Sequence, residues 1–525
     1  MALEIPGYYY DPDRRKYFRI ENSKTAPKEA AWSAANVKRR AEEESEDAAR
    51  TARLRRHARR VRPAPVRAAP LLGGLLAREA GEGGGVSPGG ETLVRAWAGG
   101  LRAKGMLRLQ PENITGGTVS SMWIGPSDER SGLGVAYGIV DGMCFAGSYI
   151  PRDGDDDINF GYAAERCPGL RLRPARYAQF TPQLMAINFH GPSRKMIVAN
   201  RAYPHFNVSI SYFTPGHSSA GDSGPAWVVD DDNDIVPFHT VLRGSNNTSV
   251  HACQPAPTGS RLTCVFGTTD GIAQLQDDQP TWLTPPAPPN HRRKRKQNTR
   301  GGRHAGHLSQ HPNSDIHPWQ QDVLSIDFLA QHPEIVLAGT RSSHVCLLDL
   351  RISPLDWRPK SNTFGHFSSV AHIKSVGPHS VLAAGPRNAM SLYDIRFLQQ
   401  QRPPRPPGGE GTTTTAPAAA NGWGNAATPI VVFPEYRNKA HVDIGLDVLT
   451  EPGYGCSGLV AAAHDDATVG LYSLQDGARI ASPAVDGIRA PGEVKSMMWQ
   501  TLPGDRHPSL FVGEGPCIKK YSFWA

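Results

Sequence analysis

The sequence predicts an all-β fold, a single β-propeller of seven blades, on three observations. Short apolar segments with strand-like alternation recur beyond residue 100, each bounded by Gly, Pro, Asn or Asp. Several share one order: an apolar strand rich in Ala or Gly, a tight polar turn, and an alternating strand with a polar end. VLAAGPRNAMSLYDI (381–395) and LVAAAHDDATVGLYSL (459–474) overlay in this order. Repeats of about 40–50 residues are typical of propellers.

The units are expected to start near residues 103, 172, 221, 318, 364, 430 and 485. DVLSIDFL (322–329) and EVKSMMWQ (493–500) have the alternation of a blade's innermost strand. Gly365-His366 precedes Tyr393-Asp394, the order of the G-H…W-D pattern of WD repeats. IKKYSFW (518–524) is predicted to pair with the N-terminal blade, because closing the ring removes exposed sheet edges.

The chain is expected to divide into an N-terminal extension, 1–99, and the propeller, 100–525. The extension combines an aromatic and basic patch in residues 1–20, a charged alanine-rich helix over 28–62, and a Pro/Gly/Ala-rich linker over 63–92. Two further Pro/Gly-rich segments interrupt the propeller and are predicted to be disordered inserts, since they contain few apolar residues: 278–317 and 397–428.

Composition narrows the class of protein. The chain of 525 residues has no window near the ~18 consecutive apolar residues that a membrane span needs, and its N-terminus does not have the pattern of a signal peptide. Its seven cysteines are scattered and never form C-x-x-C, which favours reduced thiols over disulfides or a zinc site. We therefore expect an intracellular protein without a membrane partner.

One motif raises the question of catalysis. GDSGP (221–225) resembles the nucleophile loop of trypsin-like serine proteases, with Ser223 in the nucleophile position. Acyl transfer needs a histidine base oriented by a carboxylate, and the nearest upstream histidines lie in no recognisable context for that role. Gly-Asp-Ser-Gly-Pro is also a good turn sequence. The interpretation is a loop in a protein that is not an enzyme and uses no cofactor or metal; a serine hydrolase is the alternative.

The net charge of +8 is concentrated in a few segments. One of them, RRKRK, is predicted to be a nuclear-import signal and comprises Arg292, Arg293, Lys294, Arg295 and Lys296. A solvated loop and a nucleic-acid-binding patch stay open as alternatives, although the aromatic residues that accompany RNA-binding segments are missing there. The expected location is the nucleus, with the cytoplasm as a second compartment.

Two similar boxes stand out within the repeats. HVCLLDLR (344–351) and AMSLYDIR (389–396) each contain an acid, one residue and an arginine, and the two acids are 45 residues apart. That spacing predicts equivalent positions in adjacent blades. Because residues i and i+2 of a strand project from one side, each acid and arginine should lie side by side. The repeat explains the acid, but it does not require the arginine, which is a preferred interface anchor.

The boxes resemble the tryptophan-Asp-x-Arg signature of the WD-repeat substrate receptors of cullin-four RING ubiquitin ligases. The match covers Leu348–Arg351 and Tyr393–Arg396, with Leu and Tyr in place of tryptophan. IPGYYYDPDRRKYFRI (5–20) is similar to the N-terminal segment of member four of this receptor family. The resemblance implies a non-catalytic receptor that docks on the ligase's triple-propeller adaptor through Asp349, Arg351, Asp394 and Arg396 and presents an unidentified protein substrate. A propeller scaffold in a nuclear chromatin or RNA complex is the alternative.

Overall fold

The structure is a computed structural model. It describes residues 8–11, 16–20, 32–33, 36–37, 88–109, 116–126, 134–160, 176–179, 183–202, 207–213, 238–242, 248–284, 317–357, 362–398, 427–450 and 458–523. The chain forms two units, 1–68 and 69–525, each of which is described by itself.

The first unit contains the aromatic N-terminal patch. Strands β1 (Tyr8–Asp11) and β2 (Lys16–Arg19) pair antiparallel in a two-stranded sheet. The Phe18 ring stacks on the Trp32 ring with centroids 4.6 Å apart. An isolated two-stranded hairpin is marginal in water, so aromatic packing of this kind supplies part of what the hairpin itself lacks.

The predicted charged helix is described only near its start. The backbone N–H of Val37 donates to the Ser33 carbonyl at 2.9 Å, and that of Asn36 donates to Ser33 Oγ at 3.3 Å. Ser33 therefore satisfies donors of the first helical turn, as serine does at helix N-termini. The rest of 28–62 lies outside the described residues.

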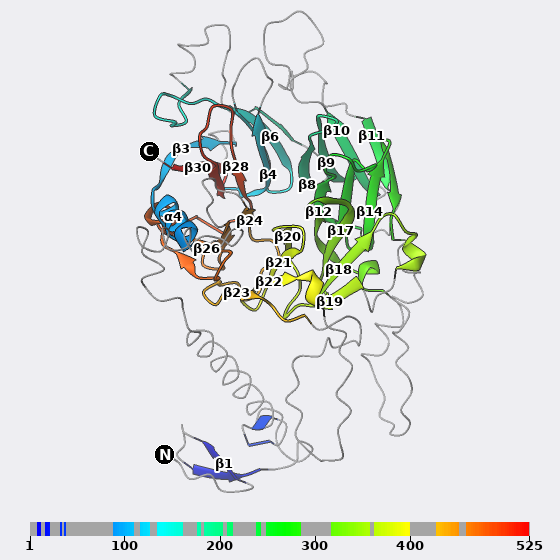
Figure 1. The fold of residues 1–525 in the computed structure, drawn as a ribbon, viewed down its shortest axis with the longest axis vertical. Coiled ribbons are helices and arrows are strands. Elements are labelled where there is room, and N and C mark those ends of the chain that lie inside the picture. Colours follow the sequence, from blue (N-terminus) through cyan, green and yellow to red (C-terminus); the bar gives the residue numbers. More distant parts are fainter. Residues whose placement is uncertain are drawn as a thin grey trace, which may run out of the picture. The chain divides into compact units, whose positions relative to one another are not determined.

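The second unit is a ring of sheets. Its described strands form seven four-stranded antiparallel sheets, which we number blades 1 to 7 (Figure 1). The first strands of the blades contact one another in a closed circle, from β4 through β8, β12, β16, β20 and β24 to β28 and back to β4. This arrangement is a β-propeller and confirms the predicted all-β class.

Blades 1 to 6 are each built from four consecutive strands. Blade 1 contains β4 (Val119–Pro126), β5 (Gly134–Val140), β6 (Cys144–Ile150) and β7 (Arg176–Gln179). Blade 2 contains β8 (Leu184–His190), β9 (Lys195–Ala202), β10 (Asn207–Phe213) and β11 (Phe238–Leu242). Blade 3 contains β12 (Val250–Pro255), β13 (Cys264–Thr268), β14 (Gly271–Gln276) and β15 (Gln279–Trp282). Blade 4 contains β16 (Val323–Leu329), β17 (His332–Thr340), β18 (His344–Asp349) and β19 (Thr363–Gly365). Blade 5 contains β20 (His372–Ser375), β21 (Ser380–Gly385), β22 (Ala389–Asp394) and β23 (Val431–Val432). Blade 6 contains β24 (Leu446–Leu449), β25 (Leu459–Ala463), β26 (Val469–Ser473) and β27 (Arg479–Ile480).

Blade 7 joins the two ends of this unit. Its strands are β28 (Met497–Gln500), β29 (Ser509–Glu514), β30 (Cys517–Phe523) and, from the N-terminal side, β3 (Leu101–Arg108). β3 pairs with β30 from Leu101 opposite Phe523 to Arg108 opposite Cys517. The predicted closure of the ring by the C-terminal strand is confirmed, and the unit expected to start near 103 begins instead at Val119.

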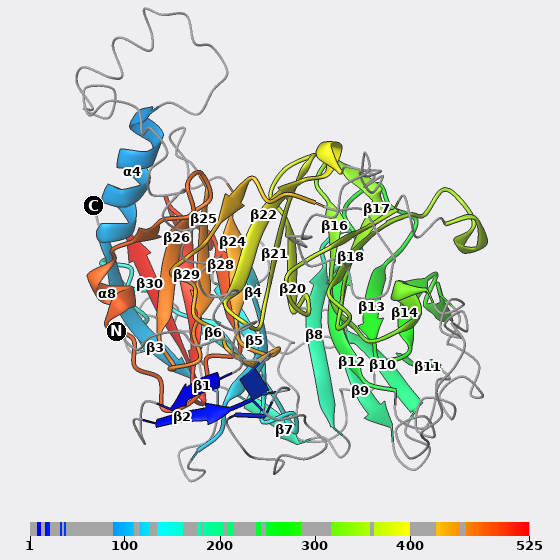
Figure 2. The ribbon, with the colours of Figure 1, turned by 90° about the horizontal axis from the view of Figure 1, so that it is seen from below.

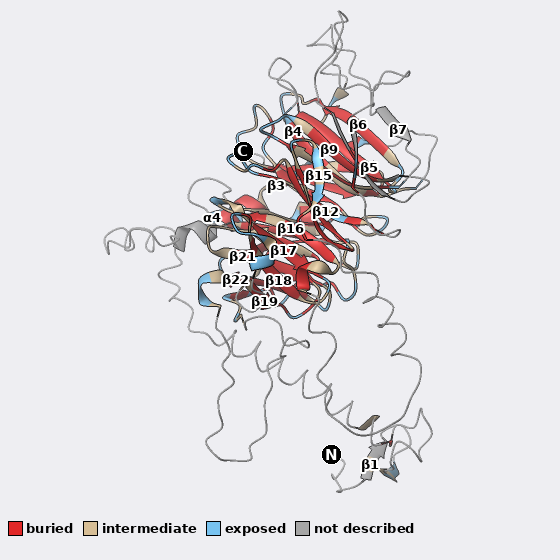
Figure 3. Cartoon of the chain, turned by 90° about the vertical axis from the view of Figure 1, so that its right-hand side faces the viewer, coloured by how far each residue is buried: buried red, intermediate tan, exposed pale blue. Residues whose placement is uncertain are grey.

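The local sequence explains the strand order. The apolar strands rich in Ala or Gly are the second strands, and the alternating strands that follow them are the third strands, as β21 and β22 show. Both are buried because each blade packs against a neighbour on both faces, and the middle strands are mostly red, the colour of buried residues, in Figure 3. The predicted innermost strands, 322–329 and 493–500, contain the first strands β16 and β28.

Polar side chains on the first strands tie neighbouring blades together. Asp327 of β16 accepts a hydrogen bond from the backbone N–H of Ser375 in blade 5 at 2.7 Å. Asp447 of β24 accepts one from the backbone N–H of Trp499 in blade 7 at 2.8 Å and pairs with Lys374 of blade 5 at 3.1 Å. The Asp447 carboxylate raises the pKa of Lys374. These contacts fix the rotation of one blade against the next.

A second tie lies at the closure. Lys520 of β30, whose side chain is fully buried, is 2.6 Å from Asp156 and 3.8 Å from Asp505. Arg152 pairs with both acids and donates to the Pro503 carbonyl. The four side chains balance two positive against two negative charges and join the loop after β6 in blade 1 to blade 7.

A helix covers the closing blade. Helix α4 (Pro88–Gly99) buries Val94, Trp97 and Ala98 against β26, β30 and Trp499 (Figure 2). The expected linker ended at residue 92 and the expected propeller began at 100, so α4 overlaps that linker and belongs to the propeller unit. Val94, Trp97 and Ala98 lie at spacings of three and four residues, so they form one apolar face of the helix that packs on the blade.

The ends of both predicted inserts are ordered. Gln279–Trp282 is the outer strand β15, because Trp282 pairs with Ala273 and packs on the blade's core. Phe397 belongs to the 3-10 turn η3 (Ile395–Phe397), and Ala427 packs on a core cluster. The remainder of both inserts lies outside the described residues. Three further short helical segments are η1 (Pro318–Gln320), η2 (Pro354–Asp356) and α8 (Pro483–Asp486).

The cysteines within the described ranges are free thiols, and three of them are buried: Cys253, Cys264 and Cys346. Burial raises the pKa of the Cys346 thiol. Among the helices in the described part of the chain, none has the length and apolar character needed to cross a membrane.

Candidate functional site

The two Asp-x-Arg boxes lie at the ends of equivalent strands. Asp349 is the last residue of β18, the third strand of blade 4, and Asp394 is the last residue of β22, the third strand of blade 5. The predicted equivalence of the two boxes in adjacent blades is therefore what the structure contains. Because both blades have the same strand order, both strands run in the same direction and end on one face, which we call the third-strand face.

Each acid holds its arginine in the same way. Asp349 Oδ1 accepts from the backbone N–H and from Nε of Arg351, both at 2.9 Å, and Oδ2 accepts from Nη2 at 2.7 Å. The corresponding distances from Asp394 to Arg396 are 2.9, 3.0 and 2.7 Å. The described contacts of both guanidinium groups thus use Nε and Nη2, and a bidentate fork of this kind fixes the plane of the group.

The acid and the arginine of each box lie close together for a different physical reason than the predicted period of a strand. The strand ends at the acid, and the arginine lies in the turn that follows, in η3 in the case of Arg396. An Asp side chain that accepts from the backbone N–H two residues on is a local turn-forming interaction. Side-by-side placement was predicted correctly, but an Asp-capped turn produces it rather than the period of a strand.

The arginines remain accessible although they are paired. The side chains of Arg351 and Arg396 are 67 % and 58 % exposed, whereas those of Asp349 and Asp394 are 26 % and 10 % exposed. The hydrogen bond from Arg351 holds the pKa of Asp349 below its usual value, and Arg396 does the same for Asp394. Both acids therefore stay ionised at neutral pH, and both arginines are held in one orientation at the surface.

The residue before each acid is part of the core. Leu348 and Tyr393 are fully buried, and they occupy the position that tryptophan has in the signature. Tyr393 O–H lies 2.9 Å from Nδ1 of His366, which follows Gly365 at the end of β19. The Gly-His and Tyr-Asp pairs of the sequence pattern thus meet in space. Burial lowers the pKa of His366 to about 4, so its imidazole is neutral.

This burial predicts a loss of stability in acid. Burial also lowers the pKa of His464 to about 4; its Nε2 lies 2.7 Å from the O–H of Tyr472. Below the unfolded value of about 6.5 the unfolded chain binds protons that the folded chain does not, so stability falls as the pH falls from about 6.5 to 4. Between pH 7.5 and 5.5 we expect the free energy of unfolding to fall by about 1 kcal/mol per buried histidine. Urea titrations at the two pH values measure this change. His464→Gln should reduce the slope; an unchanged slope would contradict the assignment.

The two box turns share one foundation. Leu347 of β18 and Ile395 of η3 pack on the same core cluster between blades 4 and 5, which includes Val345 and Tyr393. The carbonyl of the buried Leu350, which precedes Arg351, accepts a hydrogen bond from Nη2 of Arg261 in blade 3 at 2.8 Å. The turn of Arg351 is therefore held by blades 3 and 4, and both box turns are supported by the core cluster between blades 4 and 5.

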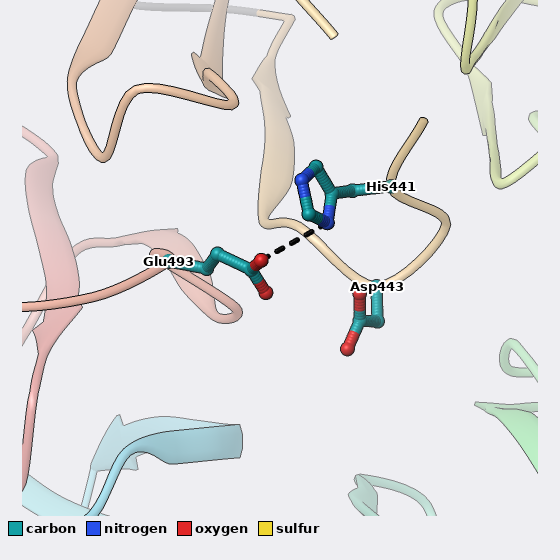
Figure 4. A group of neighbouring side chains, drawn as sticks. All are labelled: His441, Asp443 and Glu493. Carbon is teal, nitrogen blue, oxygen red and sulfur yellow. Dashed lines mark ion pairs between the residues drawn. The ribbon is translucent and has the colours of Figure 1, made fainter. Parts of the chain in front are cut away.

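A second cluster lies on the opposite face. His441 and Asp443 precede β24, and Glu493 precedes β28, so the two loops that enter adjacent first strands meet there (Figure 4). His441 Nδ1 is 3.0 Å from Glu493 Oε1, and the three ligand atoms lie within 4.8 Å of one another. These residue types could hold a divalent cation. This cluster could not be predicted from the sequence, because about 50 residues separate its two halves.

The cluster already contains a cation of its own. Lys495 Nζ is 2.7 Å from Asp443 Oδ2 and 3.9 Å from Glu493 Oε2, and the bond to Asp443 raises the pKa of Lys495. A metal ion would have to displace this ammonium group. We therefore assign the cluster to the joint between blades 6 and 7.

Other predicted site residues cannot be placed. Arg292, Arg293, Lys294, Arg295 and Lys296 lie outside the described residues, and so does Ser223. The nuclear-import signal stays a prediction, and so does the interpretation of 221–225 as a loop.

No family model matches the sequence, and no curated protein matches it. Among solved structures, the chain is similar to the WD40 β-propeller domain of Doa1, with a TM-score of 0.44 and 9 % identity over 81 % of this chain and 97 % of that domain.

Proposed function

We propose that this propeller is a non-catalytic substrate receptor of a cullin-four RING ubiquitin ligase. It docks on the triple-propeller adaptor through Arg351 and Arg396 and presents a protein substrate on another surface. The observation that carries this proposal is the pair of identical Asp-capped turns, each presenting an exposed arginine from the third-strand face of adjacent blades.

The geometry suits recognition of another protein. Arginine anchors contribute strongly to interfaces, and a side chain that is already ordered loses less entropy when it binds. Asp349 and Asp394 order the two guanidinium groups in advance, and both arginine side chains are more than half exposed, so N–H donors outside the pair with the acid can reach acceptor oxygens of a partner. On the same proposal the receptor acts in the nucleus, which the basic segment 292–296 favours.

The test is binding of the purified adaptor to Arg351→Ala with Arg396→Ala. We expect at least a tenfold loss of affinity for each arginine, and loss of co-purification for the double variant. Arg341→Ala is the matched control, because Arg341 is also an exposed arginine paired with an acid, Asp322 at 2.6 Å, but follows a second strand and lies on the opposite face.

Normal adaptor binding by the double variant, with the control also normal, would contradict the proposal. If the wild-type chain fails to bind adaptor but binds nucleic acid in a salt-sensitive way through 292–296, the alternative of a scaffold in a nuclear chromatin or RNA complex replaces it.

A further inference from the structure

Exposed apolar side chains follow both box turns directly. Leu355 is 92 % exposed, Phe397 is 68 % exposed and Ile352 is 42 % exposed. Leu355 and Phe397 are the two most exposed of the large hydrophobic side chains in the described ranges. A single exposed apolar residue is ordinary, but a group of them beside two ordered arginines is a feature of interaction surfaces.

The turn that carries Leu355 is built to hold it outward. Ser353 Oγ accepts from the Leu355 backbone N–H at 3.3 Å, and the Ser353 carbonyl accepts from Asp356 N–H at 2.8 Å, which closes η2. Trp357 then returns the chain to the core: its ring is buried and its Nε1–H donates to the Asp349 carbonyl at 2.9 Å. Leu355 is therefore the crest of a turn anchored at both ends, rather than part of a loose loop.

Phe397 occupies the corresponding place in blade 5. It ends η3, whose N-cap is Asp394, and the Ile395 N–H donates to the His379 carbonyl at 2.9 Å. The Arg396 guanidinium carbon lies 5.5 Å from the centre of the Phe397 ring, within the range of a cation–π contact. One fixed turn thus presents an arginine and an aromatic ring together.

We infer that Ile352, Leu355 and Phe397 form the apolar half of the adaptor-docking surface, with Arg351 and Arg396 as its polar half. This inference rests on the proposed function and adds the anchors that the Asp-x-Arg signature does not include. The occupant is the adaptor, because Ile352 and Phe397 directly follow the two arginines in sequence, the Phe397 ring lies against Arg396, and Trp357 ties the turn of Leu355 to the end of β18 beside Arg351. It must offer an apolar surface bordered by carboxylate or carbonyl oxygens that accept from the arginines.

The physical argument is that arginines alone make a weak anchor in water. A guanidinium group that already pairs with its own acid gains little from a second acceptor while water can reach it. Apolar contacts around it exclude water and strengthen the hydrogen bonds inside, which is the arrangement found at interface hot spots. Phe397 lies against Arg396 in blade 5, and Leu355 follows Arg351 in blade 4, so each arginine has an exposed apolar side chain in its own turn or in the turn that follows it.

The test measures the affinity of purified adaptor for Leu355→Ser with Phe397→Ser by biolayer interferometry. We expect at least a tenfold loss relative to wild type. Met106→Ser with Met143→Ser is the matched control, because these two side chains are 59 % and 52 % exposed. Met106 lies on the outer strand β3, and Met143 lies in the turn between β5 and β6, on the face opposite to the third-strand face. Circular dichroism should show both variants folded, since all four positions are at the surface.

A second measurement places the contact itself. A benzophenone side chain at position 355 should cross-link to the adaptor, whereas one at position 143 should not. If the Leu355 and Phe397 variant binds adaptor normally while the arginine variant does not, the inference is overturned and the proposed function stands. If position 355 cross-links only to a second copy of this chain, a homodimer surface replaces it. If the wild-type chain does not bind adaptor, both the function and the inference fail.

Discussion

A chain that begins at residue 110 should not fold cooperatively, whereas one that begins at Pro88 should unfold like the full protein. The two truncations differ in α4 and β3. Four side chains in these elements are buried in the closing blade and its neighbours: Val94, Trp97, Leu101 and Leu107. Burying side chains of this size contributes about 1.5–3 kcal/mol each, and the sum is comparable to the whole stability of about 5–15 kcal/mol of a typical protein.

Loss of β3 has a second consequence for the same variant. β30 then becomes an edge strand with unpaired backbone donors and acceptors, which favours association between chains. Urea unfolding followed by circular dichroism, together with size-exclusion chromatography, distinguishes the two truncations. A monomeric chain starting at residue 110 with an unchanged midpoint would show that the ring does not need its N-terminal strand.

Lys520→Met should destabilise the propeller by about 3–5 kcal/mol, because removing one partner of a buried ion pair leaves an uncompensated charge. Desolvation lowers the pKa of Lys520, which shows how unfavourable its position is without partners. After the substitution, Asp156 and Asp505 retain only Arg152 between them. The quantity to measure is the free energy of unfolding from urea titrations.

Two controls separate charge from packing. Lys195→Met removes a lysine whose side chain is 28 % exposed and whose partner Asp278 is 42 % exposed, and should cost no more than about 1 kcal/mol. Lys520→Met combined with Asp156→Asn restores the charge balance and should recover part of the lost stability. A double variant as unstable as the single one would refute the role of charge.

The sequence allowed the propeller to be predicted because its information is local. Strand–turn–strand units such as 381–395 can be recognised from their alternation and their turn residues. In the structure the two strands of this unit, β21 and β22, pair with each other. The equivalence of the boxes followed from their spacing alone. Only residues 88–92 of α4 fall within the predicted linker, where Gly, Pro and Ala are frequent, and the helix itself was not predicted. Its apolar face could not be recognised from the segment alone, because it packs against blades 6 and 7.

Only half of the proposed docking surface could be predicted from the sequence, for the same reason. An Asp-x-Arg box can be read in one segment, but the exposure of Leu355 depends on Trp357 reaching back to the end of β18. A leucine in SPLDW gives no sign of whether it points inward or outward. The joint of His441, Asp443 and Glu493 joins loops from two blades, so a single segment contains no trace of it.

The pairing of β3 with β30 also determines when, during synthesis, the ring can close. Leu101 and its partner Phe523 are 422 residues apart in the chain, so β3 leaves the ribosome long before the strand it pairs with exists. At about 5–20 residues per second the wait is roughly 20–85 s. During that time Leu101, which is buried in the finished ring, lacks the residues of blades 6 and 7 on which it packs. The nascent chain should therefore depend on chaperones until β30 has emerged.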